Sequence, residues 1–180
     1  MSVNRMVRAG QRFQDAKLTL DPVNVRILRA LQADPRISMS ELGRRVGMSA
    51  PAVTERVQRL EEAGVIVGYR LEVDPAAIGF PVVAWVRVRP GPGQLTKIAE
   101  LATTIPEVVQ CHRITGEDCF LMKVYVPAVD ELETVLDRFL LYGQTTSSIL
   151  QSSPVPGRPL PLPGDDERPA TRSGVRRSGG

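Results

Sequence analysis

The side chains with the clearest chemical use lie between Ser49 and Glu62, where polar residues recur at helical spacing. At about 100° per residue, a helix that buries Val53 turns a second set of side chains outward. Those side chains are Pro51, Thr54, Glu55, Gln58, Arg59 and Glu62. Gln and Arg can bond purine edges, Glu can accept a hydrogen bond from cytosine, and the Thr methyl group can contact thymine. This face therefore has the chemistry to read base edges in the major groove of duplex DNA.

Three more residues complete the predicted contact set. Ser49 stands where the helix would begin, and Arg56 lies at the flank of its buried stripe. Arg56 either contacts a phosphate or pairs with a carboxylate of the preceding helix, such as Glu41. Arg70 either contacts a phosphate or is a solvated surface arginine. An ordinary helical hairpin with a polar face is the alternative interpretation. The residues expected to contact DNA are Ser49, Pro51, Thr54, Glu55, Arg56, Gln58, Arg59 and Arg70.

Cys111 and His112 could suggest an enzyme, but the rest of the sequence does not support a catalytic function. His112 is the only histidine and follows Cys111, a pair that could supply a base and a thiolate. Neighbours on one strand point to opposite faces, so the two cannot readily form such a pair. Cys119 is expected to be a small buried hydrophobic residue. No metal-ligand spacing, phosphate loop or Ser/His/Asp set stands out, so we expect no enzyme, no metal and no cofactor.

Three short helices are predicted to hold the polar face in place. Asp21 is a good N-cap for the first helix, and Pro22 suits its first position. Ser38 begins the second helix with the S-x-x-E spacing of a capping box, and Gly47 suits the left-handed position that ends it. Each helix has an apolar stripe. The stripes are Ile27, Leu28 and Leu31, then Met39, Leu42 and Val46, then Val53, Val57 and Leu60.

The connection between the second and third helices is short, because only Gly47, Met48 and Ser49 separate them. Two helices meeting at a tight turn, with a third in front, form a helix-turn-helix unit. The sequence therefore predicts an N-terminal domain over residues 19–75 that presents its third helix outward. Within it, apolar side chains recur at every second position, which predicts a half-buried extended segment that Gly68 bends into a small wing. These residues are Val65, Val67, Tyr69, Leu71 and Val73.

A second domain is predicted at residues 82–155, after a linker at residues 76–81. Its elements follow the order βαββαβ, the ferredoxin-like arrangement with a four-stranded antiparallel sheet and both helices on one face. The overall fold class is therefore α+β. Strands are expected at 82–88, 108–114, 119–126 and 145–153, and helices at 93–105 and 129–143, the second closed by Gly143. The open face of the sheet would expose apolar side chains such as Trp85, so at least a homodimer is expected.

Charge divides between the two predicted domains. Residues 1–70 carry 12 Lys/Arg against 7 Asp/Glu, whereas residues 71–155 carry 6 against 10. A basic first part is typical of a segment that meets a polyanion, although charge runs are often only solvated faces. No apolar run approaches the roughly 20 residues that span a bilayer. The N-terminus also lacks the apolar core of a signal peptide, so a cytoplasmic protein is expected.

The motifs together resemble the Lrp/AsnC, or feast/famine, family of transcription regulators. The resemblance covers roughly residues 19–155 and rests on "LDPVNVRILRALQADPRIS", "ELGRRVGMSAPAVTERVQRLEEAGVIVGYRLEVDP" and "TGEDCFLMKV". It implies a winged helix-turn-helix domain and a C-terminal domain that senses amino acids and drives assembly. It also implies dimers that can associate into octamers or other rings, with small effectors bound between subunits.

The resemblance also points to an effector site at the turn Gly116, Glu117, Asp118 and Cys119. The family's turn often reads Gly-Asp-aromatic-Asp, so this sequence departs from the pattern and leaves the identity of the effector open. Gly116 frees the backbone for close approach, and the two carboxylates can attract an α-ammonium group. An ordinary solvated hairpin turn is the alternative interpretation.

The two ends complete the predicted organisation. Residues 1–18 form an N-terminal extension, and residues 156–180, rich in Pro, Gly, Ser and Arg, a disordered tail. The predicted function is a sequence-specific DNA-binding transcriptional regulator that responds to a small effector, an amino acid by resemblance. The alternative is an amino-acid-binding module whose N-terminal domain contacts protein rather than DNA.

Overall fold

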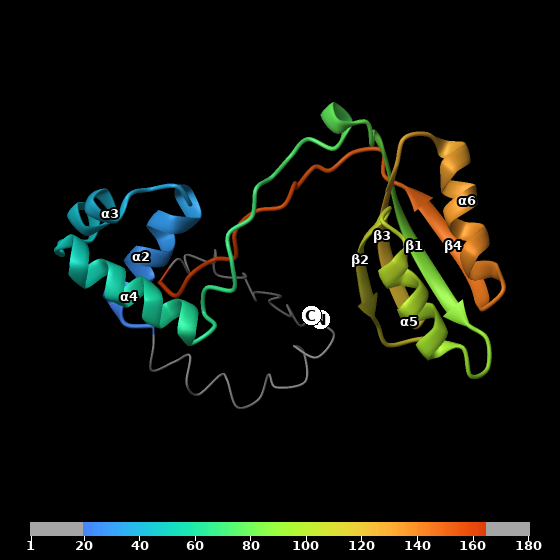
Figure 1. Cartoon of the computed structure of the whole chain (residues 1–180), viewed down its shortest axis with the longest axis horizontal. Coiled ribbons are helices and arrows are strands. Elements are labelled where there is room, and N and C mark those ends of the chain that lie inside the picture. The colour runs from blue at the N-terminus through green and yellow to red at the C-terminus, as the bar shows by residue number, and fades with distance from the viewer. Residues whose placement is uncertain (1–19, 165–180) are drawn as a thin grey trace, which may run out of the picture. The chain divides into compact units, whose positions relative to one another are not determined.

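The computed structural model describes residues 20–164 of the 180-residue chain (Figure 1). The described residues form two compact units, one of residues 20–70 with 157–164 and one of residues 71–156. The predicted N-terminal extension at residues 1–18 lies outside the described part. Each unit has its own hydrophobic core.

The first unit contains helices α2 (Pro22–Ala33), α3 (Met39–Val46) and α4 (Ala50–Glu62). Their predicted starts are confirmed, because the side chains of Asp21, Ser38 and Ser49 each accept a backbone N–H three residues on, at 2.6, 3.2 and 3.4 Å. Gly47 ends α3 in the left-handed region, with φ 75° and ψ 39°. These local signals fix the break and restart that separate α3 from α4.

The apolar stripes of the three helices meet in one core. The core residues are Ile27, Leu28, Leu31, Ile37, Leu42, Val46, Val53, Val57 and Leu60. Gly43 of α3 allows this packing, because a Cβ atom there would lie 2.6 Å from the backbone oxygen of Met48. The capping box is only half formed. Ser38 caps α3, but the Glu41 carboxylate pairs with Arg44 and Arg45 of the same helix.

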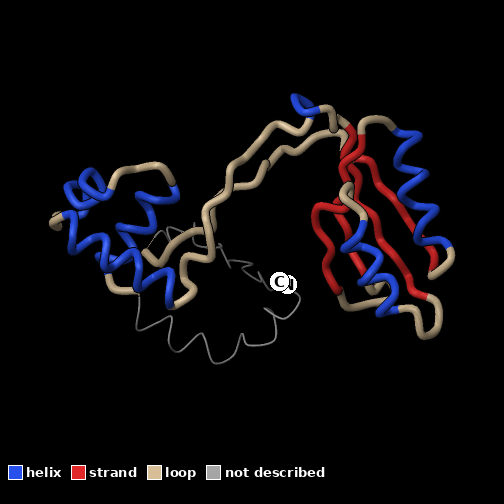
Figure 2. Tube along the Cα trace, in the orientation of Figure 1, coloured by secondary structure: helices blue, strands red, loops and turns tan. Residues whose placement is uncertain are grey.

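The half-burial predicted for residues 65–73 is wrong beyond the first residues of the segment. Val65 and Ile66 pack against the helical core, whereas the segment that follows has no strand and is drawn as a loop in Figure 2. Val67 and Leu71 are 70% and 89% exposed. The reason is the lack of a partner strand: within residues 20–164 the only sheet is the four-stranded one of the second unit, so no strand pairs with this segment.

The second unit is a sheet with two helices on one face, as predicted (Figure 1). A short 3-10 helix, η1 (Ala76–Ile78), lies within the predicted linker and precedes the sheet. The strands are β1 (Val82–Pro90), β2 (Val108–Arg113), β3 (Phe120–Val126) and β4 (Gly143–Ile149), and the helices are α5 (Leu95–Thr104) and α6 (Val129–Leu140). All strand pairs are antiparallel, in the order β2-β3-β1-β4.

Alternation along the strands separates a buried face from an open one. On β3, Phe120, Met122, Val124 and Val126 are buried under the helices, and the residues between them are half-buried on the other face. On α6, Leu132, Val135 and Phe139 are buried and Leu136 is partly buried, which confirms the predicted inward stripe. The helix-covered face is therefore the core of this unit.

The role predicted for Gly143 is wrong. Helix α6 ends at Leu140, and Gly143 is the first residue of β4, paired with Pro90 of β1. A Cβ atom at Gly143 would lie 2.2 Å from the carbonyl oxygen of Arg89. Gly143 is therefore required by the close approach of two strands and not by a helix end, and β4 spans fewer residues than the predicted 145–153.

Candidate nucleic-acid interface and effector site

Helix α4 presents a polar outward face. Pro51, Glu55, Gln58 and Arg59 are exposed on it, and Thr54 is half-buried. The Thr54 hydroxyl donates a hydrogen bond of 2.8 Å to the carbonyl of Ala50. That bond occupies the hydroxyl proton and leaves the methyl group for an apolar contact such as a thymine methyl. The predicted outward set is thus brought together on one helix face.

Arg59 and Glu55 form an ion pair along this face. Both side chains are mostly exposed. Surface pairs of this kind contribute about 0 to 1 kcal/mol, because solvent screens them and the side chains lose rotamer freedom. The pair therefore offers little resistance when a phosphate or a base competes for Arg59.

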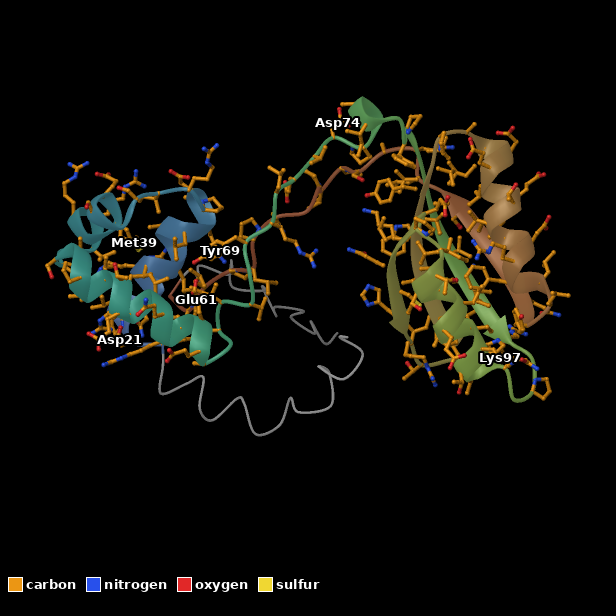
Figure 3. All side chains as sticks on the ribbon, viewed as in Figure 1. Asp21, Met39, Glu61, Tyr69, Asp74 and Lys97 are labelled. Carbon is orange, nitrogen blue, oxygen red and sulfur yellow. The ribbon has the colours of Figure 1, made fainter. Side chains whose placement is uncertain are left out.

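Arg56 has an intramolecular partner, but not the one predicted. Its Nη1 donates to Asp21 Oδ2 at 2.5 Å and to Asn24 Oδ1 at 3.0 Å, whereas Glu41 is occupied by its own helix neighbours. Asp21 is the N-cap of α2, labelled in Figure 3, so one carboxylate both caps α2 and ties it to α4. The Arg56 guanidinium and the Asn24 N–H hold the pKa of Asp21 below its ordinary value of 3.8.

Arg70 is exposed at the end of the first unit and borders a groove beside Tyr69. The Tyr69 hydroxyl donates to Glu61 Oε1 at 3.1 Å, and both residues are labelled in Figure 3. Burial and the neighbouring carboxylate raise the pKa of Tyr69. This hydrogen bond holds Tyr69 against the end of α4. Arg70, the next residue, is therefore kept close to that helix.

The predicted effector turn is a compact loop between β2 and β3. The Ile114 N–H donates to the Cys119 carbonyl at 3.0 Å and closes it. Gly116 has φ 110°, a conformation that side chains disfavour, and open space surrounds the position of a Cβ atom. Cys119 is half-buried and packs against the core, in line with its predicted hydrophobic role.

Arginines of β1, which the sequence analysis did not single out, face the two turn carboxylates. Arg89 pairs with Glu117, and its Nε lies 3.7 Å from Asp118 Oδ1. Arg87 Nη1 lies 3.6 Å from Asp118 Oδ2. The carboxylates therefore already have cationic partners. The available signal was the alternation of Trp85, Arg87 and Arg89, which places all three on one face of a strand.

No catalytic arrangement emerges around the histidine. Cys111 and His112 pair with Met122 and Leu121, on opposite faces of the sheet. Cys111 is exposed at the edge strand, yet neighbouring atoms partly desolvate its thiol and raise its pKa. In the part of the chain that the structure describes, no group of three His, Cys, Asp or Glu residues could hold a metal ion. Among residues 20–164 there is also no helix with the length and apolarity to cross a membrane.

Two family models match the chain in the order of its units. A winged helix-turn-helix DNA-binding model matches residues 20–67, and the Lrp/AsnC ligand binding domain matches residues 82–160. The HTH-type transcriptional regulator LrpC of Bacillus subtilis is 33% identical over 135 residues, which cover 75% of this chain and 94% of LrpC. LrpA of Mycobacterium tuberculosis is 34% identical over 137 residues, covering 76% and 89%.

A solved structure supports the same assignment. A transcriptional regulator from Neisseria meningitidis, solved in complex with L-Met, matches with a TM-score of 0.73 at 26% identity, over 80% of this chain and 97% of that one. A helix-turn-helix unit followed by a ligand-binding βαββαβ domain defines a DNA-binding transcriptional regulator. The chain belongs to the Lrp/AsnC family of these regulators.

Proposed function

We propose that this regulator reads its operator with the outward face of α4 and that an amino acid bound near the β2–β3 turn changes its affinity for DNA. The observation that carries the first part is the capped helix α4, whose polar face is exposed and held by a complete core behind it. A helix presented in this way fits the major groove of B-DNA.

The proposed DNA contacts divide by role. Gln58, Glu55 and the Thr54 methyl group are the candidates for base edges. Arg59 and Arg70 are the candidates for phosphates, because their side chains are exposed. Ser49 and Pro51 shape the start of the helix that enters the groove. Of the two roles expected for Arg56, we favour the intramolecular pair: it positions α4 against α2 through Asp21.

The proposed effector site combines charges of both signs. Arg87 and Arg89 can receive a carboxylate, while Glu117 and Asp118 can receive an ammonium group. An amino acid carries both groups on one carbon. Its carboxylate could therefore bind the arginines while its ammonium group binds the turn carboxylates, so that no charge is left unpaired. The L-Met complex of the Neisseria meningitidis relative supports this ligand class.

A homodimer through the open face of the sheet is part of the proposal. On that face, the Lys123 ammonium lies 5.9 Å from the Trp85 ring centroid and 5.0 Å from that of Tyr125. The cation thus lies against two aromatic rings, and the surface offers both apolar area and cation–π contacts to a second copy. Higher assemblies, such as octamers, would use further surfaces.

Calorimetry of the full chain with each of the common amino acids tests the effector assignment. At least one should bind, and Arg89→Gln should weaken its binding by roughly tenfold or more, the loss expected when a charge-assisted hydrogen bond is removed. Arg138→Gln, an exposed arginine on α6, is the matched control and should bind as the wild type does. Unchanged binding in Arg89→Gln, or no binding of any amino acid by the wild type, would refute the assignment.

Linkage supplies a second readout. If ligand changes DNA affinity by some factor, DNA must change ligand affinity by the same factor. Titrations of ligand with and without operator DNA should therefore give matching ratios, and Arg89→Gln should reduce the response to ligand while DNA binding without ligand persists.

A further inference from the structure

The end of the described chain belongs to the DNA-binding unit. Residues 157–164 follow the last strand of the ligand-binding domain, yet they group with the helices of the first unit (Figure 1). Leu162 lies beyond the stretch that the Lrp/AsnC ligand-binding model matches, which ends at residue 160. Composition predicts a disordered tail at residues 156–180; in the part of it that the structure describes, Leu160 and Leu162 contact the helices.

Two contacts hold the segment. Leu162 is half-buried and packs against the core shared by α2, α3 and α4. The Gln32 side-chain amide of α2 donates to the carbonyl oxygen of Leu160 at 3.3 Å. The Leu160 side chain, by contrast, is 81% exposed. One leucine therefore points to the helices and the other to solvent, which is the pattern of a segment lying along a surface.

The sequence of the segment suits it for docking. Pro159, Pro161 and Pro163 alternate with the two leucines. Each proline fixes φ near about −65° and reduces the freedom of the undocked chain, so ordering so short a segment costs less entropy. Proline also has no N–H group, so the backbone polar groups that a partner must satisfy are mostly carbonyls. The Gln32 amide satisfies one of them.

The helical unit offers a receptive surface at this place. Gln32 borders an apolar groove of about 290 Å³ that is lined by α2 and by the chain after α4, including Leu28, Leu31, Val65 and Ile66. Gln32 lines this groove and also binds the segment, so the segment lies beside open apolar surface of α2.

We propose that residues 157–164 are a docking arm, in which the chain's own C-terminal segment covers the surface of α2 beside the helical core. The DNA-binding domain is then assembled from two separate parts of the sequence, with the ligand-binding domain between them. The arm stabilises the helices that hold α4, and Leu162 is its anchor.

Amide hydrogen exchange of the full chain tests this arm. In Leu162→Asp, residues 157–164, 28–35 and 64–70 should lose protection, because a half-buried apolar anchor is replaced by a charge that demands water. Leu160→Asp is the matched control: the same change, two residues away, at an exposed side chain, should leave protection in all three regions as in the wild type. Equal exchange in the wild type and Leu162→Asp would overturn the proposal, as would protection that depends on protein concentration, since the arm would then dock on a second copy.

Truncation gives an independent check that does not depend on a buried charge. A chain ended after Gly164 should keep the wild-type protection and melting temperature of the helical unit, whereas a chain ended after Pro156 should lose both in part. Identical behaviour of the two truncated chains would contradict the docking arm.

Discussion

Asp21 links local structure to packing within the helical unit. It caps α2 through the Asn24 N–H and binds Arg56 of α4, a residue 35 positions away. Arg56 had been expected to meet either a phosphate or a carboxylate such as Glu41. The contact with Asp21 leaves the exposed arginines, Arg59 and Arg70, as the phosphate contacts of the proposed interface.

The pair Asp21–Arg56 predicts a pH dependence. Because Arg56 holds the pKa of Asp21 below 3.8, the pair stabilises the fold above the unfolded-state pKa, and this contribution is lost as pH falls through the lower folded-state pKa. Urea unfolding should show that Arg56→Met lowers the free energy of unfolding at neutral pH by less than about 1 kcal/mol, since the pair is partly exposed. The variant should also lose less stability than the wild type on acidification.

The control for this prediction is the Asp21→Asn background, in which Arg56→Met should not change the response to acid. Parallel loss of stability in the wild type and Arg56→Met on acidification would contradict the assignment of the pKa shift to Arg56.

Gln58 and Arg59 should separate base reading from phosphate binding. Gln58→Ala should change which base is preferred at one operator position, at a cost of about 1 to 3 kcal/mol for the preferred base. Arg59→Gln should weaken binding to all sequences and reduce the salt slope by about 1. Selection from a randomised DNA pool followed by salt titration measures both. A uniform loss in Gln58→Ala would assign it to the backbone instead.

The ends of the helices could be predicted from the sequence, because capping residues act on the backbone within one helical turn. Asp21, Ser38, Ser49 and Gly47 act where the sequence indicated, because a cap is formed by residues within one turn. The order of strands and helices in the second domain was likewise readable from alternation and helical spacing. The sequence therefore predicted which helices and strands are present and in what order.

Features set by distant neighbours were not predictable in this way. The sequence predicts a helix end at Gly143, whereas its actual role depends on the pairing of β1 with β4, where the close approach of Arg89 excludes a Cβ atom. The partners of Glu117 and Asp118 depend on the register of β1 against β3. The sequence located the turn that is proposed to bind the effector, but it could not show that Arg87 and Arg89 pair with its carboxylates.

Gly43 predicts a cost that depends on the packing of α3 against the start of α4. Alanine is favoured over glycine within a helix by about 1 kcal/mol. At residue 43, however, its Cβ atom would meet the Met48 backbone oxygen at 2.6 Å, and overpacking costs about 1 to 3 kcal/mol. Gly43→Ala should therefore lower the free energy of unfolding in urea. Ser40→Ala, at an exposed position of the same helix, should change it by less than about 0.5 kcal/mol. A Gly43→Ala variant that is more stable than the wild type would contradict this prediction and show that the backbone at Met48 moves to accept the Cβ atom.

For the whole molecule, the open face of the sheet predicts self-association. Sedimentation of the full chain at micromolar concentration should give at least a dimer, and Trp85→Glu should shift it toward monomer by placing a charge in the interface. Leu141→Glu is the matched control, since Leu141 follows α6 and is 84% exposed. A monomeric wild type, or equal effects of the two substitutions, would rule out this face as the interface.

The central claim is that the first unit binds duplex DNA through α4, and the salt dependence of DNA affinity tests it most directly. Binding of the full chain to operator and to unrelated duplex DNA should be followed by fluorescence anisotropy across a range of salt concentrations. We predict that log Kd rises linearly with log salt concentration, because lysine and arginine contacts displace counterions from phosphates, and that the operator binds more tightly throughout. Arg59→Gln should flatten the slope. Absence of duplex affinity, or an affinity that neither salt nor Arg59→Gln changes, would contradict the account and favour an N-terminal domain that contacts protein.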